Sequence, residues 1–445
     1  MSDHAQTIDW LDRTAEAAPD DLAVADPGER LTYAELRARA GFLAGTLLRR
    51  GVSAGDHVAI DLPAGVAHAV ALHGAILAGA VVQSLPPRGR GDAPVAPGAF
   101  AVDAETLADA DAEPSTWAEV DRDSAAPLTR VLSSGTSGEP KPIELTAANH
   151  EASARASAVR LGTDPGDRWL CCLPLNHVGG LTILIRSVIY GTAAVIEDGF
   201  DAQRVAALMD SGEVTMASLV PTQLVRLLDS GAPLERPRLL LIGGGPLPLD
   251  VLEEALGRGA TVVQTYGLTE ACSQVCTLAP HEARERSGSA GRPLEGTEVR
   301  ILDEEILVRG PTVAPGSIAA DGWLHTGDHG RLDEEGYLWV EGRRDDLIVS
   351  GGENVRPERV EALLREHPGV ADAGVVGAED REWGQVVVAF VVPTPGAEIS
   401  TQDLLDLARS RLAPPEVPKR VEIAEALPRT ATGKLRRAAL RGRIS

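Results

Sequence analysis

Apolar residues along the chain follow two alternating periods. Within residues 30–50 they share one face of a helix, with a period of about 3.6 residues: Leu36, Ala40, Leu43, Ala44, Leu47 and Leu48. A short apolar run at 57–62 then predicts a strand, followed by a helix over 65–78 and a second strand at 80–85. Strands that alternate with helices in this way predict βαβ units and a parallel sheet.

The alternation continues to about residue 295 and then changes. The Pro-, Gly- and Asp-rich stretch 86–127 predicts irregular surface or short elements. Apolar runs closed by Pro or Gly predict further strands at 168–175, 193–198, 215–220, 238–244 and 261–267. Beyond residue 295, short strands separated by turns are expected at 298–302, 305–310 and 336–342.

A smaller unit is predicted from about residue 344. Its first helix is expected to start near Pro357, because proline suits the first helical turn. Two strands and a helix follow, at 370–377, 386–393 and 401–412. The pattern therefore predicts an α/β protein with two domains, residues 1–343 and 344–445, which its length of 445 residues allows.

The balance of charge argues against one class of partner. The chain has 65 acidic and 42 basic residues, a formal net charge of −23, whereas a nucleic-acid-binding protein needs a basic surface to neutralise phosphates. The N-terminus shows no secretory signal pattern. Polar residues interrupt the apolar stretches 68–85 and 179–198, which therefore predict buried elements rather than membrane spans. We expect a cytoplasmic protein.

Lysine and cysteine are scarce. The acidic, arginine-rich composition fits a protein that stays soluble in high salt, but a high-GC codon bias would also favour arginine. A lysine retained against such a bias indicates that a compact ammonium is required. The three lysines are Lys141, Lys419 and Lys434. The four cysteines have no metal-ligand spacing and are expected to be buried, reduced and structural: Cys171, Cys172, Cys272 and Cys276.

A Ser/Gly-rich segment follows the predicted strand at 128–132. Hydroxyls, freed backbone amides and one lysine together form a cradle for polyphosphate oxygens. By itself such a segment is usually only a loop, and the P-loop pattern is absent. The candidate phosphate-binding residues are Ser133, Ser134, Gly135, Thr136, Ser137, Gly138 and Lys141.

Two later strands also end in segments that suit a nucleotide. Glycines let the backbone approach a base or ribose closely, a tyrosine can stack on adenine, and a threonine and a glutamate can bind a phosphate oxygen and Mg²⁺. Ligands of α/β sheets collect at strand ends of this kind. The candidates are Gly243, Gly244, Gly245, Tyr266, Gly267, Thr269 and Glu270.

Three residues nearer the C-terminus complete the set. Asp328 follows a tight turn and suits the ribose hydroxyls, while Arg343 follows the next hairpin and can donate to ribose or phosphate. Lys434 lies on a Thr/Gly turn, where lysine is by itself usually a surface residue.

Five motifs, in this order, resemble those of the acyl-adenylate-forming superfamily, which includes acyl- and aryl-CoA ligases, peptide adenylation domains and beetle luciferases. They are SSGTSGEPK (133–141), YGLTE (266–270), HTGD (325–328), EGRRDDLIVSGGENVRPERVE (341–361) and LPRTATGK (427–434). The resemblance extends from residue 31 to residue 437. It implies a large N-terminal domain of layered sheets and helices, a small α+β C-terminal lid, and ATP bound between them.

The resemblance also implies roles around ATP. The 133–141 loop would hold the β- and γ-phosphates, Thr269 and Glu270 would contact the α-phosphate and Mg²⁺, and Asp328 and Arg343 would hold the ribose. In these roles the side chains position ATP and neutralise its charge and form no covalent bond, because catalysis at phosphorus depends mainly on positioning and electrostatic stabilisation.

The lid would act twice. Lys434 would reach the carboxylate and the α-phosphate, where an ammonium offsets the charge that builds up between two anions. Asp345 matches the hinge of the family. Rotation there would replace Lys434 by a face near Gly352 that lines the tunnel for coenzyme A (CoA).

Within the superfamily, the segments 169–191 and 266–275 are most similar to the o-succinylbenzoate–CoA ligase family of menaquinone biosynthesis. That acid is a dicarboxylate, and a second carboxylate in an apolar pocket needs a cation. Arg186, inside an apolar run, is the candidate; a structural ion pair or an exposed guanidinium is the alternative. His177 matches a histidine beside the acyl pocket, with a buried core histidine as the alternative.

The sequence thus predicts activation of a carboxylic acid by ATP and transfer of the acyl group to CoA. Another aryl or medium-chain acid, or a carrier protein as acceptor, stays open. A catalytically silent nucleotide-binding protein is disfavoured because Lys141, Glu270, Asp328 and Lys434 are all present. No nucleic-acid partner and no membrane insertion are expected, and a homodimer is compatible with the sequence.

Overall fold

A computed structural model describes residues 10–86, 94–112, 120, 123–133, 141–343, 346–350, 353–380, 383–430 and 433–444, with only the backbone of Arg343 and Asn354. The chain forms two compact units, Met1–Val299 with Val308–Leu324 and Arg300–Leu307 with His325–Ser445. The domain boundary predicted between residues 343 and 344 stays a prediction.

The first unit contains a nine-stranded sheet in the order β14-β13-β12-β11-β10-β8-β9-β1-β2. The six strands from β12 to β1 are parallel, and β13, β14 and β2 are antiparallel to their neighbours. Their bounds are β1 Leu22–Ala25, β2 Arg30–Thr32, β8 Arg168–Cys171, β9 Ala193–Ile196, β10 Met216–Leu219, β11 Leu239–Ile242, β12 Val262–Leu268, β13 Ser273–Thr277 and β14 Arg292–Pro293. Every residue of β9, β10 and β11 is buried, as in parallel sheets covered on both faces.

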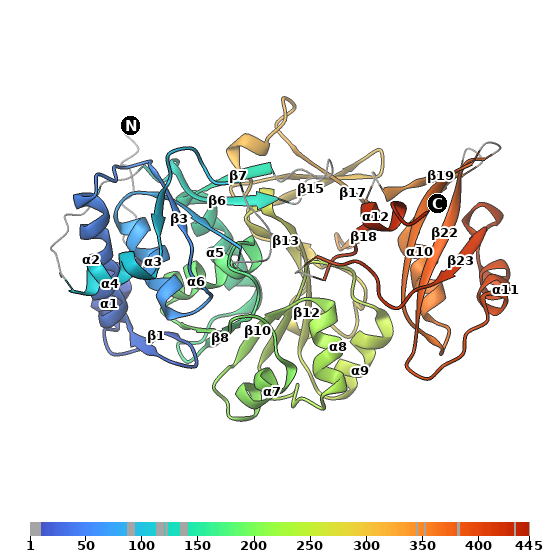
Figure 1. Cartoon of the computed structure of the whole chain (residues 1–445), viewed down its shortest axis with the longest axis horizontal. Coiled ribbons are helices and arrows are strands. Elements are labelled where there is room, and N and C mark those ends of the chain that lie inside the picture. Colours follow the sequence, from blue (N-terminus) through green and yellow to red (C-terminus); the bar gives the residue numbers. More distant parts are fainter. Residues whose placement is uncertain are drawn as a thin grey trace. The chain divides into compact units, whose positions relative to one another are not determined.

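A second sheet of the first unit has the order β5-β3-β4-β6-β7. Its strands are β3 His57–Ile60, β4 Val81–Ser84, β5 Phe100–Val102, β6 Pro127–Ser133 and β7 Lys141–Thr146. The predicted irregular stretch 86–127 contains β5 and the short helix α4, Ala104–Ala112. Strands β6 and β7 form an antiparallel pair that Figure 1 shows in teal.

The helices of this unit begin and end where local chemistry dictates. Helix α2 begins after Thr32, whose hydroxyl accepts from the Glu35 N–H while the Glu35 carboxylate accepts from the Thr32 N–H, a capping box. The predicted apolar face of α2 is buried, apart from the partly exposed Leu48. The other long helices are α1 Trp10–Ala17, α3 Val66–Leu77, α5 Ala147–Leu161, α6 Val178–Tyr190, α7 Ala202–Asp210, α8 Pro221–Asp229 and α9 Leu249–Gly257, with α2 at Tyr33–Arg49. Apolar side chains of α7, α8 and α9 (green in Figure 1) form one buried cluster with β8, β10 and β11.

The second unit contains most of the antiparallel sheet β15-β16-β17-β18 and a five-stranded sheet, β20-β19-β22-β21 with β23 beside β22. Helix α10 starts at Pro357, as predicted. The strands are β15 Glu298–Leu302, β16 Glu305–Arg309, β17 Leu324–Leu332, β18 Leu338–Arg343, β19 Ile348–Ser350, β20 Glu353–Val355, β21 Val370–Asp380, β22 Gly384–Pro393 and β23 Arg420–Ile423. The helices are α10 Pro357–Arg365, α11 Thr401–Arg411 and α12 Arg437–Arg441.

The predicted α/β class and the alternation of strands with helices are confirmed. All four cysteines are unpaired and buried, also as predicted. Among the described residues, no helix is long and apolar enough to cross a bilayer.

Candidate active site

The parallel strands β8, β10, β11 and β12 bring several predicted site residues to one edge of the large sheet. Neighbouring strands in this series are parallel throughout, so their carboxyl ends lie at the same edge. The chain continues past them through 172–177, Val220, 243–245 and 269–270. Open α/β sheets bind ligands outside the carboxyl ends of their strands, so this edge is the candidate nucleotide site.

Close packing requires glycines at two of these strand ends. A Cβ at Gly267 would lie 1.6 Å from the carbonyl oxygen of Ser273, and one at Gly243 would lie 2.9 Å from Cγ2 of Thr265. Gly244 has a left-handed φ of 79°. The backbone is therefore bare of side chains here, and a flat base or ribose can approach it closely.

Glu270 follows β12 in the short 3₁₀ helix η1, Thr269–Ala271. Its backbone oxygen accepts from the Ala314 N–H at 2.8 Å, which fixes the turn. No described residue forms a hydrogen bond or an ion pair with its partly buried carboxylate. Mg²⁺ is commonly held by one or two protein carboxylates together with substrate phosphates. Glu270, with the Thr269 hydroxyl beside it, fits such a ligand set.

The turn after Glu270 is strained. Cys272 and Ser273 are non-glycine residues with left-handed φ values of 50° and 88°. The Ser153 hydroxyl donates to the Cys272 carbonyl at 2.7 Å and holds this conformation from helix α5. Backbone strain of this kind is concentrated at functional sites, which agrees with a binding role for the segment.

The β6–β7 pairing places Ser133 opposite Lys141. Lys141 is exposed at the start of β7. The other predicted phosphate-loop residues, Ser134, Gly135, Thr136, Ser137 and Gly138, lie outside the described residues. The hairpin thus holds both ends of the predicted loop together.

His177 is the N-cap residue of α6. A Cβ at Gly180 would lie 2.6 Å from the Pro174 carbonyl oxygen, so the turn that carries His177 is tight. Burial lowers the pKa of His177. The ring is therefore neutral near pH 7 and offers one donor and one acceptor.

Arg186 on α6 is buried, with 2% of its surface exposed. Its Nη1 donates to Oε1 of Gln274 at 2.8 Å and its Nη2 donates to the Ser153 hydroxyl at 2.7 Å. Within the described part of the chain, Nε has no hydrogen-bond partner and no carboxylate pairs with the guanidinium. The side chain is thus neither exposed nor tied to a described acid.

The charge of Arg186 acts on neutral neighbours. Burial, and then the Arg186 charge, lower the pKa of His150 to about 3. Burial raises the pKa of the Cys272 thiol to about 12 against the opposing effect of Arg186. A buried cation with only neutral partners is costly, and an incoming carboxylate would offset that cost.

In the second unit, the strands β17 and β18 place Asp328 opposite Arg343. Asp328 is buried, and its N–H donates to the Thr326 hydroxyl at 3.1 Å. Directly opposed residues of an antiparallel pair are close enough to act on one ligand. The two predicted ribose residues therefore come together in one hairpin.

Lys434 is exposed on a turn whose ends are hydrogen-bonded to each other. The Thr430 N–H donates to the Lys434 carbonyl at 2.8 Å, and the Lys434 N–H donates to the Thr430 hydroxyl at 3.1 Å. The predicted hinge Asp345 and the CoA-side Gly352 lie outside the described residues.

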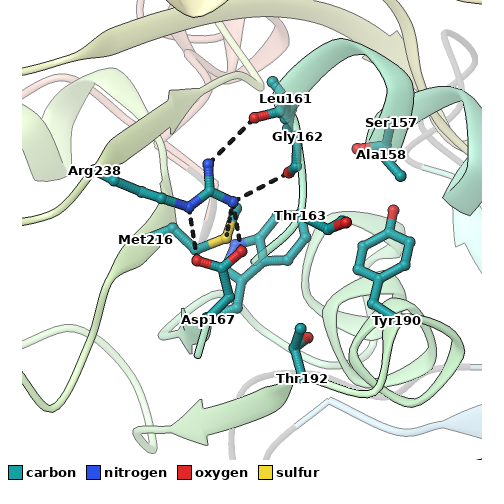
Figure 2. Close-up of a pocket in the computed structure, with 11 residues that line it drawn as sticks. Ser157, Ala158, Leu161, Gly162, Thr163, Asp167, Tyr190, Thr192, Met216 and Arg238 are labelled. Carbon is teal, nitrogen blue, oxygen red and sulfur yellow. Dashed lines mark hydrogen bonds and ion pairs between the residues drawn. The ribbon is translucent and has the colours of Figure 1, made fainter. Parts of the chain in front are cut away.

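A small pocket on the first unit lies at the opposite edge of the large sheet (Figure 2). Asp167, Thr192, Met216 and Arg238 belong to the amino ends of β8, β9, β10 and β11. Arg238 lines the pocket, pairs with Asp167 at 2.6 Å and donates to the carbonyls of Leu161 and Gly162. We interpret these contacts of Arg238 as structural, because they join the end of α5 to the sheet.

Comparison with known families decides the class of the chain. The model for AMP-binding enzymes matches residues 11–93 and 91–322, and the model for the C-terminal domain of AMP-binding enzymes matches residues 359–434. The chain belongs to the AMP-binding enzyme family. The motif resemblance seen in the sequence is thereby confirmed.

Individual AMP-binding enzymes are similar over nearly their full length. The 2-succinylbenzoate–CoA ligase of Bacillus licheniformis is 39% identical over 96% of this chain and 98% of its own. The o-succinylbenzoate CoA synthetase MenE of Bacillus subtilis, in complex with the acyl-adenylate intermediate OSB-AMP, is 36% identical with a TM-score of 0.86 over 97% of both chains. The same enzyme with ATP and magnesium ion has a TM-score of 0.87 and is 36% identical, over 97% of this chain and 99% of its own.

Two groups of residues near the candidate sites were not predicted from the sequence. Ser153 and Gln274, which hold Arg186, are distant from it in sequence and carry no local signal. A second set received no role and is centred on Arg437, three residues after the LPRTATGK motif. Its other members are Asp346, Glu358 and Glu361.

Proposed function

We propose that this AMP-binding enzyme is an ATP-dependent 2-succinylbenzoate–CoA ligase. Two features of the first unit carry the proposal. One is a strand edge lined by glycines that also bears Glu270, and the other is the buried Arg186, which has no carboxylate partner among the described residues. The near full-length relatives of that name support the same acid. Cytoplasmic location and a homodimer remain predictions.

In the proposed first step, a carboxylate oxygen of the acid attacks the α-phosphorus of ATP. The bond from the α-phosphorus to the bridging oxygen breaks and pyrophosphate leaves. Lys434 would hold its ammonium near both anions and stabilise the negative charge of the transition state. Mg²⁺ bound by Glu270 and Thr269 would neutralise phosphate charge. Asp328 and Arg343 would hold the ribose. The adenine would lie against Tyr266 and the glycines at the strand ends, which are Gly243, Gly244, Gly245 and Gly267.

In the proposed second step, the CoA thiol loses its proton to solvent and its sulfur attacks the acyl carbon. The bond between that carbon and the AMP oxygen breaks, and AMP leaves with the electron pair. Rotation about Asp345 would withdraw Lys434 and bring the segment near Gly352 to the acyl group. Such an exchange lets one site perform two reactions in sequence.

Arg186 would bind the carboxylate that is not activated. Its guanidinium has a free Nε among the described residues and two hydrogen bonds to neutral side chains, so a carboxylate can take over one of those contacts and add charge pairing. Neutral His177 would contact the acid without adding a charge.

The direct test is a screen for pyrophosphate release over carboxylic acids, with and without CoA. We expect 2-succinylbenzoate to give both pyrophosphate and a CoA thioester. A thioester formed from a benzoate or a fatty acid but not from 2-succinylbenzoate would sink the proposed substrate. Pyrophosphate release that never leads to a thioester would point to another acceptor, such as a carrier protein.

A Lys434→Ala variant tests the division of labour. Adenylation should fall by about 10²–10³-fold, the scale of removing one preorganised transition-state contact. Thioester formation from pre-formed acyl-adenylate and CoA should persist. An equal loss in both half-reactions would contradict the assigned role of Lys434.

A further inference from the structure

The second unit contains a largely buried arginine, Arg437, that has no part in the two proposed reaction steps. Arg437, whose side chain is 10% exposed, lies within ion-pairing distance of three carboxylates. Its Nη1 is 3.2 Å from Oδ2 of Asp346, and its Nη2 is 2.9 Å from Oε1 of Glu358 and 2.8 Å from Oε1 of Glu361. We call these four residues the Arg437 cage.

The carboxylates of the cage come from the segment next to the predicted hinge. Asp346 directly follows Asp345, on the lid side, while Glu358 and Glu361 lie in the first half of α10. Glu358 also packs on β18, because a Cβ at Gly342 would lie 2.5 Å from Glu358 Oε2. The cage therefore lies on the lid side of residue 345, and Glu358 alone also approaches β18, which precedes that residue.

Arg437 itself lies three residues after Lys434, and the connection between them is short and held in place. Leu435 and Leu440 pack in an apolar cluster with residues of β21 and β22. On the other side of the turn, Arg429 pairs with Asp372 at 2.7 Å and donates to the Gly433 carbonyl at 2.7 Å. The turn is therefore clamped before and after Lys434, and a shift of Arg437 shifts the lysine.

The charges in the cage do not balance. Burial lowers the pKa of Arg437, but the three carboxylates raise it more, so the guanidinium stays charged. Burial raises the pKa of Glu358 to about 7; Arg437 opposes this rise, and Glu361 and Asp346 add to it. Both directions are consistent, because one buried guanidinium cannot satisfy three carboxylates. Arg441 helps only from the exposed side, 3.5 Å from Asp346.

We propose that Arg437 is a positioning residue for adenylation: it ties the Lys434 turn to the lid side of the predicted hinge, so that the hinge segment and the lysine move together. This inference rests on the proposed function, in which Lys434 acts on the carboxylate and the α-phosphate. Because Asp346 is the first residue after the hinge, rotation there is passed to Lys434 through the cage.

The test compares half-reactions in the full-length enzyme. Arg437→Gln should lower adenylation by about 100-fold, the cost expected when a catalytic group is displaced by about 1 Å. Thioester formation from pre-formed acyl-adenylate should change by less than about 3-fold, since Lys434 has left the acyl group by then. The matched control is Arg411→Gln, which removes an exposed arginine paired with Glu366 in the same unit.

A double variant separates positioning from general damage. In a Lys434→Ala background, Arg437→Gln should add less than about 2-fold to the loss of adenylation, because residues that act through one group are not additive. Equal loss in both half-reactions, or full additivity with Lys434→Ala, would overturn the proposal.

If Arg437→Gln does not fold by circular dichroism, Arg437→Lys, which keeps the charge but loses the fork, should show the same split with a smaller loss. If that variant is also unfolded, the cage is purely structural and the inference is wrong. If the unaltered enzyme adenylates another acid, only the proposed substrate fails and the comparison is made with that acid. If it adenylates none, the proposed function fails first.

Discussion

Arg186 and Arg437 are both buried, one in each unit, and their surroundings differ in charge. Arg186 donates to the neutral side chains of Gln274 and Ser153 and has no described acid beside it. Arg437 lies among three carboxylates. A buried cation without a counter-ion is stabilised strongly when an anion binds beside it. A cation that already lies among several carboxylates is not stabilised further by another anion. This difference supports the two proposed roles, Arg186 as the arginine that binds the second carboxylate and Arg437 as the residue that positions the Lys434 turn.

The largest difference should appear in stability without ligand. Arg437→Met removes the only buried cation described in the cage and should lower the free energy of unfolding of the second unit by about 3–5 kcal/mol. Arg186→Met removes a charge that has no acid partner and should change stability by less than about 1 kcal/mol, because the lost hydrogen bonds offset the relief. Urea unfolding near neutral pH, followed by circular dichroism, measures both. Equal losses would erase the proposed distinction.

The next effect sharpens the comparison from the substrate side. Arg186→Gln should reduce kcat/KM for 2-succinylbenzoate by about 30-fold or more, equivalent to about 2 kcal/mol of lost charge pairing. An analogue lacking the second carboxylate should be used about equally well by both proteins, and KM for ATP should not change. If kcat/KM for the analogue fell as much as kcat/KM for 2-succinylbenzoate, Arg186 would only support the fold.

The smallest expected effect concerns pH and the cage. The pKa of Glu358 is raised by burial from 4.5 to about 7, so the folded protein binds a proton more tightly than the unfolded chain. This group therefore contributes most favourably below pH 4.5, and its contribution is lost as the pH rises through 7. Glu358→Gln should remove that dependence. Urea midpoints measured at about pH 5 and about pH 8 should differ less in the variant than in the unaltered protein, and an unchanged difference would contradict the assignment.

The fold was largely predictable because apolar periodicity reports burial directly. The strands at 239–242 and 262–268 and the helix beginning at Pro357 fall where the pattern placed them. The candidate nucleotide-binding residues could also be predicted from the sequence, because Gly243, Thr269 and Glu270 directly follow apolar strands. Parallel pairing then brings those strand ends to one edge.

The partners of the two arginines were not predictable for a physical reason. Gln274 reaches Arg186 only because β13 turns back antiparallel beside β12, after the strained turn at Cys272 and Ser273. Asp346 and Arg437 likewise meet only after the second unit has folded. Contacts between residues distant in sequence depend on topology, and local periodicity carries no information about them.

The order of strands in the large sheet has a consequence for how the protein is made. The first strand, β1, pairs with β9 through Val24 and Ala194, and the Tyr33 hydroxyl donates to the carbonyls of Ser187 and Thr192. At a synthesis rate of about 5–20 residues per second, the N-terminal β1–β2 hairpin waits roughly 10 to 30 s for its partner strand. During that time one edge of β1 has no partner strand, and its unpaired backbone N–H and C=O groups are a template for pairing with another chain.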